Sequence, residues 1–341
     1  MKKPKLVIVP RSYGKYAHNA LEKLSHVFDL NYLPMDNLRN DMSDNEIIKL
    51  LNDADAIIIG GYGRINRHIM ESIPSLKIIA KRGIGLDNIE LNAATELGIV
   101  VTYARHTMEE ISVAEYTAAL ILACARRLVE ADKKVKAGKY HERASLIGIE
   151  LRNKKLGIIG FGAIGRRVAQ IMKNGFGMKV IAYDPYVPDE IFEEYGVKRM
   201  DLDTLVSSSD IITIHTPLTP ETKNLINEER LRRIKEGAII VNTARGAVIN
   251  EKALVNQIKA GRIFACGLDV TAKEPPEKDN PLMLLNNVII TPHIAAFTYE
   301  ALKRIDTAIA EDLIAFFSGK RPIRVANPEV FNKPLRFKIK V

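Results

Sequence analysis

The feature that most constrains the fold is an apolar segment, residues 155–159, that runs directly into a glycine-rich turn and a helix-like segment. The first glycine of such a turn permits a tight bend, the second lets the backbone approach a phosphate, and the third allows a helix to pack closely on a strand. The N-terminus of the helix then offers free N–H groups and a positive dipole end. This context predicts a dinucleotide-binding unit. Its turn is Gly160-Phe-Gly162-Ala163-Ile164-Gly165.

A second apolar segment, residues 179–183, ends in Asp184. It follows the glycine turn at about the 20-residue spacing expected of the acid that binds the ribose. A carboxylate there accepts hydrogen bonds from the ribose hydroxyls and repels a 2′-phosphate. The next residues, Pro185-Tyr186-Val187, supply no Lys or Arg to offset that charge. The sequence therefore predicts NAD, in preference to NADP, as the cofactor.

Short apolar strands alternate with helical segments along almost the whole chain, which predicts α/β layers on parallel sheets. From the glycine turn onward six strands are expected, the number in a complete doubly wound fold. A chain of 341 residues is long enough for two domains. The later strands are expected at residues 156–159, 180–183, 211–215, 238–242, 266–270 and 288–291, and the earlier ones at 6–10, 56–60, 76–80 and 99–102.

The glycine turn lies in the middle of the chain, so a separate domain must precede it. A final helix, expected at about residues 299–317, is assigned to that first domain, which makes it discontinuous. We therefore expect two Rossmann-like domains with parallel sheets, the nucleotide-binding one inserted into the other. The substrate-binding domain is placed at residues 1–105 plus 298–341 and the NAD-binding domain at 106–297. The inserted domain includes a long helix expected to begin near Ser112, with Glu115 completing a capping box.

Composition excludes several classes of protein. The net charge of +9 is spread along the chain, without an arginine-rich helix, an aromatic RNA motif or zinc-finger spacing. We expect it to attract anionic ligands rather than nucleic acid. The longest apolar run, residues 118–125, is far shorter than the roughly 20 residues of a membrane span. Two cysteines, Cys124 and Cys266, lie in apolar segments and are expected to be buried thiols, which fits the cytoplasm.

Chemistry-bearing residues follow three successive strands of the second domain. Arg245 comes after the strand at 238–242, Asp269 and Glu274 after the next, and His293 after the last. The carboxyl ends of parallel strands meet at one edge, where open α/β sheets bind ligands. A guanidinium suits a carboxylate substrate, and a carboxylate beside an imidazole fixes its tautomer and stabilises its protonated form. The three strand ends predict acid–base chemistry on an anionic substrate, without a metal site.

With these motifs the chain resembles the D-isomer-specific 2-hydroxyacid dehydrogenases, which include phosphoglycerate dehydrogenases, glyoxylate and hydroxypyruvate reductases and D-lactate dehydrogenases. The resemblance covers essentially the whole chain and is strongest over residues 155–296. It implies hydride transfer between NAD and C2 of a small 2-oxo or D-2-hydroxy acid. The matching segments are 82–88, 112–115, 160–165 with Asp184, 215–219, 242–246, 267–275 and 291–296.

The resemblance also implies roles for individual residues. Arg245 would orient the substrate's carboxylate and carbonyl, His293 would donate the proton, and Glu274 would pair with His293. Asp269 would meet the nicotinamide side of the cofactor. A homodimer built on the helix near Ser112 and the segment after it is implied as well. Backbone contacts to the substrate are implied at Gly83, Ile84 and Gly85, and further cofactor contacts at His215, Thr216, Pro217, Thr243, Ala244, Ala295 and Ala296.

The identity of the acid stays open. The loop at residues 104–109 departs from the pattern common in the family, and cations there and at Lys81 and Arg82 would suit a phosphate or a second carboxylate. Without such a role, the substrate would be small, such as glyoxylate or hydroxypyruvate. Two other functions are alternatives: an NAD-sensing corepressor on the same fold, and a formate or phosphite dehydrogenase. Glu274 argues against the formate type, where that position resembles glutamine.

Overall fold

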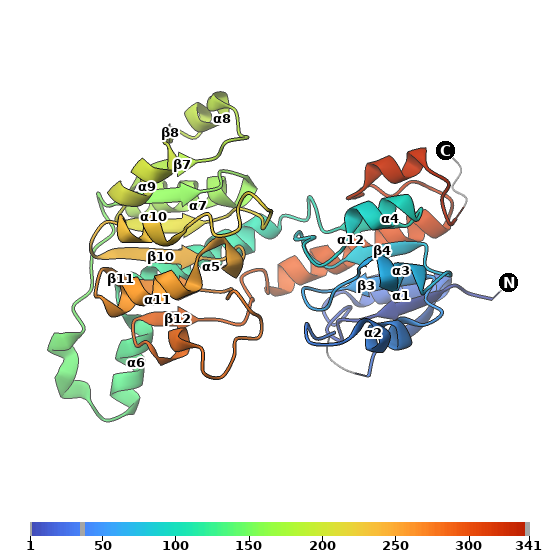
Figure 1. The fold of residues 1–341 in the computed structure, drawn as a ribbon, viewed down its shortest axis with the longest axis horizontal. Coiled ribbons are helices and arrows are strands. Elements are labelled where there is room, and N and C mark those ends of the chain that lie inside the picture. The colour runs from blue at the N-terminus through green and yellow to red at the C-terminus, as the bar shows by residue number, and fades with distance from the viewer. Residues whose placement is uncertain (1, 35–37, 338–341) are drawn as a thin grey trace. The chain divides into compact units, whose positions relative to one another are not determined.

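The structure is a computed structural model that describes residues 2–34 and 38–337 (Figure 1). The chain divides into two compact parts. We call residues 1–109 with 297–341 the split part, and residues 110–296 the inserted part. Each part is a parallel sheet between two layers of helices.

The split part contains a five-stranded sheet of order β2-β1-β3-β4-β5, with every pair parallel. Its strands are β1 (Lys5–Ile8), β2 (Asp29–Tyr32), β3 (Ala56–Ile59), β4 (Ile78–Lys81) and β5 (Val100–Tyr103). Its helices are α1 (His18–Val27), α2 (Asp44–Leu51), α3 (Arg67–Glu71), α4 (Leu91–Glu96), α12 (Tyr299–Phe317) and the 3-10 helix η4 (Pro328–Asn332).

Burial on both faces explains the continuous apolar strands of this sheet. Every residue of β3 is buried, as expected of a central parallel strand covered on both sides. One face packs against α1 and α12, and the other against α2, α3 and α4. Because α12 lies in the same core as α1, the C-terminal segment completes the fold begun by the N-terminal one.

A buried ion pair joins β4 to α12 within the split part. The Arg82 guanidinium contacts both carboxylate oxygens of Asp306, with Nε–Oδ1 and Nη2–Oδ2 distances of 2.6 and 3.0 Å. The side chains are only 6% and 0% exposed. Burial raises the pKa of Asp306, whereas its hydrogen bond and proximity to Arg82 oppose that rise. Arg82 is thereby neutralised inside the protein.

The inserted part contains a seven-stranded parallel sheet of order β12-β11-β10-β9-β6-β7-β8. Its strands are β6 (Lys155–Ile159), β7 (Lys179–Tyr183), β8 (Lys198–Arg199), β9 (Ile211–Ile214), β10 (Ala238–Asn242), β11 (Ile263–Leu268) and β12 (Val288–Ile290). Its helices are α6 (Leu128–Lys136), α7 (Ala163–Phe176), α8 (Asp189–Glu194), α9 (Leu202–Ser208), α10 (Glu228–Arg232) and α11 (Glu251–Lys259), with 3-10 turns η1 (Tyr140–Ser145), η2 (Gly246–Val248) and η3 (Pro281–Leu284). Helix α5 (Glu109–Ala125) begins at the boundary of the two parts.

The helices of the inserted part sort onto the two faces of its sheet. Helices α5, α7 and α8 contribute to one core, and α9, α10 and α11 to the other. Successive residues of a strand alternate between these cores: Ile158 lies in the first and Ile159 in the second. The β6–turn–α7 unit is therefore held between two apolar layers, which fixes the direction of its glycine turn.

The predicted fold class, two parallel α/β sheets, is confirmed. Two strands escaped prediction. The edge strand β2 is polar and partly exposed, and β8 is two exposed residues long, so neither carries an apolar pattern. The expected capping box at Ser112 and Glu115 is wrong, because α5 begins at Glu109 and both residues lie inside it. Acidic residues 109 and 110 suit the positive end of a helix and extend it by one turn.

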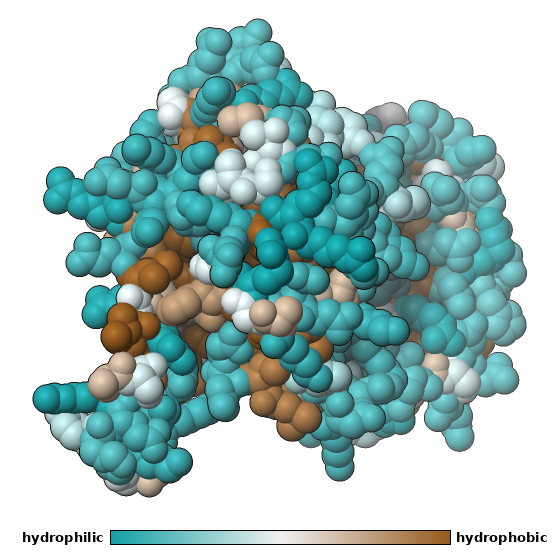
Figure 2. Space-filling view, turned by 60° about the vertical axis from the view of Figure 1, so that its left-hand side comes forward, coloured by the Kyte–Doolittle hydropathy of each residue, from teal (hydrophilic) through white to brown (hydrophobic). Residues whose placement is uncertain are grey.

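No helix among the described residues is both long and apolar enough to cross a membrane. An arm, residues 128–148, extends from the inserted part through α6 and η1 (Figure 1). Neither α6 nor η1 buries a residue. Apolar side chains reach the surface near this arm (Figure 2). Those of the arm that are more than half exposed are Leu128, Val135, Tyr140 and Ile147.

Candidate active site

The three glycines of the turn between β6 and α7 have different surroundings. Gly160 has φ +92°, and a Cβ there would lie 2.8 Å from the carbonyl of His215. At Gly165 a Cβ would lie 2.2 Å from the carbonyl oxygen of Gly160, so glycine permits α7 to pack on the turn. At Gly162 a Cβ would meet nothing within 4 Å. The space beside Gly162 is therefore left open above the backbone.

The N-terminus of α7 opens onto this space. The N-cap residue is Gly162, which has no side chain that could bond to the N–H groups of the first turn. The first N–H groups of a helix have no partner within the helix, so those of Ala163 and Ile164 are available to an anion. An open cradle beside unsatisfied N–H groups fits the pyrophosphate of NAD.

Asp184, at the end of β7, is tied to the glycine turn. Its carboxylate accepts hydrogen bonds from the backbone N–H of Phe161 at 2.8 Å, of Tyr186 at 2.9 Å and of Val187 at 3.2 Å. These bonds fix the carboxylate while leaving acceptor capacity for hydroxyl groups. The geometry fits the predicted ribose-binding role.

One cation near Asp184 was not anticipated from the sequence. The Arg199 guanidinium, from β8, donates to the main-chain oxygen of Asp184 at 3.0 Å and pairs with Asp189 at 2.7 Å. Its position could not be predicted because β8 carries no apolar pattern. Since Asp189 offsets the charge of Arg199, the carboxylate of Asp184 still favours a ribose without a phosphate.

His215 and Thr216, after β9, pack against the other side of the glycine turn. Burial lowers the pKa of His215 to about 3, so its imidazole stays neutral. Nε2 lies 3.0 Å from the hydroxyl of Thr213, whereas Nδ1 has no hydrogen-bond partner among the described residues. The Thr216 hydroxyl is equally unpartnered there. Buried polar atoms are rarely left unpaired, which is consistent with a polar ligand beside this turn. Pro217 follows at the surface.

The register of three parallel strands sets the level of the chemistry-bearing residues. Asn242 of β10 pairs with Leu268 of β11, which pairs with Ile290 of β12. The next residue on each strand is Thr243, Asp269 and Thr291, respectively. The three loops therefore leave the sheet side by side, as predicted for Arg245, Asp269, Glu274 and His293.

The loop that carries Arg245 is braced by its own strand end. The Asn242 side chain donates to the carbonyl of Arg245 at 2.9 Å and accepts from the N–H of Ala244 at 2.9 Å. Gly246 comes so close to the neighbouring loop that a Cβ would lie 2.0 Å from the carbonyl carbon of Thr271. The Arg245 guanidinium donates to the carbonyl of Ala244 at 2.8 Å. This loop holds the cation beside the loop of Glu274.

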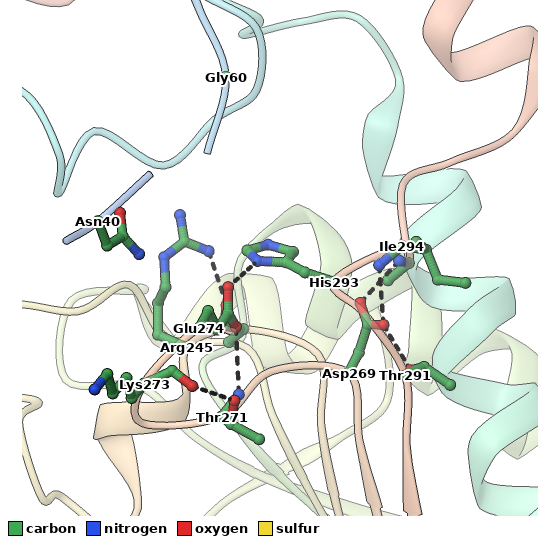
Figure 3. A network of polar contacts seen from close by, with 12 residues as sticks. Asn40, Gly60, Arg245, Asp269, Thr271, Lys273, Glu274, Thr291, His293 and Ile294 are labelled. Carbon is green, nitrogen blue, oxygen red and sulfur yellow. Dashed lines mark hydrogen bonds and ion pairs between the residues drawn. The ribbon is translucent and has the colours of Figure 1, made fainter. Parts of the chain in front are cut away.

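His293 and Glu274 point toward one another across the edge of the sheet (Figure 3). Nδ1 of His293 lies 2.8 Å from a carboxylate oxygen of Glu274. The side chains are 34% and 20% exposed, so the pair is partly screened from water yet reachable. Because Nδ1 faces the carboxylate, Nε2 is the ring nitrogen left to exchange a proton with a ligand.

Asp269 lies underneath His293 and holds its segment (Figure 3). Its carboxylate, 1% exposed, accepts from the Thr291 hydroxyl at 2.6 Å and from the N–H groups of Ile294 and Ala295 at 3.0 and 2.8 Å. Its carbonyl accepts from the N–H of His293 at 2.9 Å. Burial raises the pKa of Asp269, and the hydrogen bonds to its carboxylate partly oppose that rise.

The backbone of His293 has φ +55°, a left-handed conformation that side chains other than glycine seldom adopt. Such a conformation costs roughly 1–3 kcal/mol and persists only where the surroundings enforce it. Asp269 supplies that enforcement. The sequence predicted the carboxylate but missed its partner Thr291, although a threonine directly after a strand was a usable signal. Ala296 closes the segment and the inserted part.

In the split part, the predicted substrate segment forms the turn after β4. Gly83 has φ +140°. Its N–H donates to the carbonyl of Lys81, and its carbonyl accepts from the N–H of Ala104. Within the described part of the chain, the N–H groups of Ile84 and Gly85 have no hydrogen-bond partner. Two adjacent free N–H groups can bind a carboxylate oxygen.

The two cationic side chains at the end of β4, Lys81 and Arg82, already have partners within the split part. Nζ of Lys81, a buried residue, donates to the carbonyl of Gly60 at 2.7 Å and to Oδ1 of Asn88 at 2.5 Å. Arg82 is neutralised by Asp306. Neither side chain is positioned as an open phosphate site. The described residues also contain no group of three His, Cys, Asp or Glu that could hold a metal ion.

The sequence profile described as D-isomer specific 2-hydroxyacid dehydrogenase, NAD binding domain, matches residues 118–295. The chain belongs to this family. The predicted family and the predicted NAD-binding domain are thereby confirmed.

Named relatives within the 2-hydroxyacid dehydrogenases differ in their substrates. A D-3-phosphoglycerate dehydrogenase of Archaeoglobus fulgidus is 45% identical over 85% of this chain, which spans only 54% of that relative's length. A hydroxypyruvate reductase of Thermotoga maritima is 40% identical over 88% of this chain and 97% of its own. The crystal structure of D-lactate dehydrogenase from Aquifex aeolicus, complexed with NAD and lactic acid, has a TM-score of 0.81 at 32% identity, covering 95% of this chain and 99% of that one.

The second and third glycines of the fingerprint, Gly162 and Gly165, predict separable defects in this protein. Gly162→Ala places a methyl group in open space, so we expect the melting temperature to stay within about 2 °C and the Kd for NADH to rise at least tenfold (~1.4 kcal/mol). Gly165→Ala forces a Cβ against a carbonyl oxygen and should destabilise the fold by about 1–3 kcal/mol. Calorimetry and NADH fluorescence titration measure the two effects.

Gly175→Ala is the matched control on the same helix. Its Cβ meets nothing within 4 Å, and it lies near the far end of α7. We expect unchanged NADH affinity and a gain in stability of about 0.5–1 kcal/mol. Wild-type NADH affinity in Gly162→Ala would contradict the cradle assigned to this turn.

Proposed function

We propose that this protein is an NAD-dependent oxidoreductase that interconverts a small 2-oxo acid and its D-2-hydroxy acid. The observation that carries the proposal is the His293–Glu274 pair, which shares one sheet edge with Arg245. An anion-binding cation beside an acid–base pair is what a 2-oxo acid requires for reduction. The glycine turn and Asp184 support NAD as the hydride carrier, and the family assignment supports the reaction class.

When bound, NADH supplies the hydride that reduces C2 of the acid. The Arg245 guanidinium would bind the substrate carboxylate and polarise the carbonyl oxygen at C2. His293 would deliver a proton from Nε2 to that oxygen, with Glu274 stabilising the imidazolium through Nδ1. In the reverse direction His293 accepts the hydroxyl proton. In the split part, the N–H groups of Ile84 and Gly85 are by themselves a candidate site for a carboxylate oxygen.

Within the family, we propose an unphosphorylated acid, with hydroxypyruvate or glyoxylate as the first candidates. A phosphate or second carboxylate requires free cations, and the two at the end of β4 are engaged: Arg82 with Asp306, and Lys81 with Gly60 and Asn88. The exposed Arg105 and His106 of the neighbouring loop keep phosphohydroxypyruvate as a second candidate.

A turnover panel tests this proposal. The purified protein is assayed with glyoxylate, hydroxypyruvate, pyruvate, phosphohydroxypyruvate, formate and phosphite, each with the NADH or NAD couple and with the NADPH or NADP couple. We expect the highest kcat/KM with hydroxypyruvate or glyoxylate and NADH. Preference for phosphohydroxypyruvate would contradict the choice of substrate. Oxidation of formate or phosphite would contradict the reaction, and NADH binding without turnover of any compound would favour a corepressor.

His293→Ala tests the proposed proton donor. A positioned acid–base contributes about 10²–10⁴-fold, so kcat/KM for the best 2-oxo acid should fall by at least a hundredfold. His26→Ala, an exposed histidine at the end of α1, is the control and should leave kcat/KM unchanged. A loss below tenfold in His293→Ala would exclude proton donation by this residue.

We also propose a homodimer and a cytoplasmic location. The exposed apolar side chains of the arm support self-association, because soluble monomers seldom expose such groups together. Two buried free thiols, Cys124 and Cys266, are consistent with a reducing compartment.

Sedimentation velocity tests the proposed homodimer. It should show a dimer for the wild type and a monomer for Val135→Asp, with Lys136→Asp as a charge control. A monomeric wild type would contradict the first proposal.

A further inference from the structure

Thr117, on helix α5, contacts the loop that carries Arg245. Its hydroxyl oxygen lies 2.8 Å from the carbonyl oxygen of Val113 and 2.9 Å from the hydroxyl oxygen of Thr243. Thr117 is fully buried, and Thr243 is 7% exposed. The helix and the strand end are thus joined by a hydroxyl pair shielded from water.

The number of protons determines the direction of these hydrogen bonds. A threonine hydroxyl has one proton to donate, and the carbonyl of Val113 can only accept. The proton of Thr117 is therefore used on Val113, and Thr243 must donate its own proton to Thr117. This orients the Thr243 side chain and leaves its oxygen as an acceptor only. In this buried pair the direction of both hydrogen bonds is therefore fixed.

Thr243 occupies the position between the brace residue Asn242 and the loop that carries Arg245. Asn242 holds the carbonyl of Arg245 and the N–H of Ala244 from within the loop. Thr117 instead ties the loop to a separate element, α5. Because the loop is short, a shift at Thr243 is carried to the guanidinium two residues later.

The preceding residue of α5 approaches the loop of His293. Burial raises the pKa of Tyr116, while hydrogen bonding to Thr291 lowers it and the charge of Asp269 raises it further. Thr291 in turn donates to Asp269, which holds His293. The geometric link between α5 and the site is therefore the hydroxyl pair of Thr117 and Thr243.

We propose that Thr117 is a positioning residue for the reaction: through Thr243 it holds Arg245 where a substrate carboxylate binds. This inference rests on the proposed function. It predicts that loss of the Thr117 hydroxyl weakens the binding of the 2-oxo acid and leaves the binding of the cofactor unchanged. The reason is that the loop of Arg245 moves while the glycine turn stays intact. A small displacement of a binding group is costly to an oriented reaction.

The test compares Thr117→Val, which keeps the shape and removes the hydroxyl, with Thr117→Ser, which keeps the hydroxyl. For Thr117→Val we expect KM for the best 2-oxo acid to rise about tenfold or more, with the Kd for NADH within twofold of wild type. Thr117→Ser should restore KM to within threefold. Thr307→Val is the matched control, because Thr307 makes the same bond to its own helix (Oγ1 to the Lys303 carbonyl, 2.8 Å) at an exposed site.

Thr243→Val breaks the same pair from the other side and keeps the inference testable if Thr117→Val does not fold. It should raise KM similarly, and the double variant should raise it no further than either single variant. An unchanged KM in a folded Thr117→Val or Thr243→Val would overturn the inference, as would a parallel loss of NADH affinity in Thr117→Val. No turnover by the wild type would instead reject the proposed function.

Discussion

The parallel register of β10, β11 and β12 is the constraint on which the proposed active site depends. Because Asn242, Leu268 and Ile290 lie in one row, the three loops start at the same level of the sheet. Arg245 and His293 come only three residues after their strands end, so the register of the sheet carries over to these two side chains. The pair of His293 with Glu274 then brings the carboxylate of the β11 loop to the same edge.

Buried carboxylates turn that register into defined geometry. Asp269 holds the segment of His293 from below, including a residue with left-handed backbone, and Glu274 fixes the ring from the side. In the split part, Asp306 neutralises Arg82 at the end of β4. The two buried acids have opposite consequences for function. Asp269 supports the proposed proton donor, and Asp306 leaves Arg82 without a free charge at the end of β4.

Much of this arrangement could be predicted from the sequence because it depends on local patterns. Most strands of both sheets are apolar runs, the glycine turn follows one of them, and parallel strands deliver Arg245, Asp269 and His293 to one edge. What could not be predicted depends on contacts between distant residues. Arg199 approaches Asp184 from a strand of two residues, Arg82 meets Asp306 across more than 200 positions, and α5 starts a turn earlier than its expected capping box.

In the proposed reaction, the cofactor held at this sheet edge transfers a hydride to C2 of a 2-oxo acid while His293 protonates the oxygen. The most direct test uses NADH deuterated on the transferred position of the nicotinamide, with hydroxypyruvate as the acid. We expect D-glycerate with one deuterium at C2, detected by mass spectrometry and chiral chromatography. L-glycerate, or D-glycerate without deuterium at C2, would contradict it.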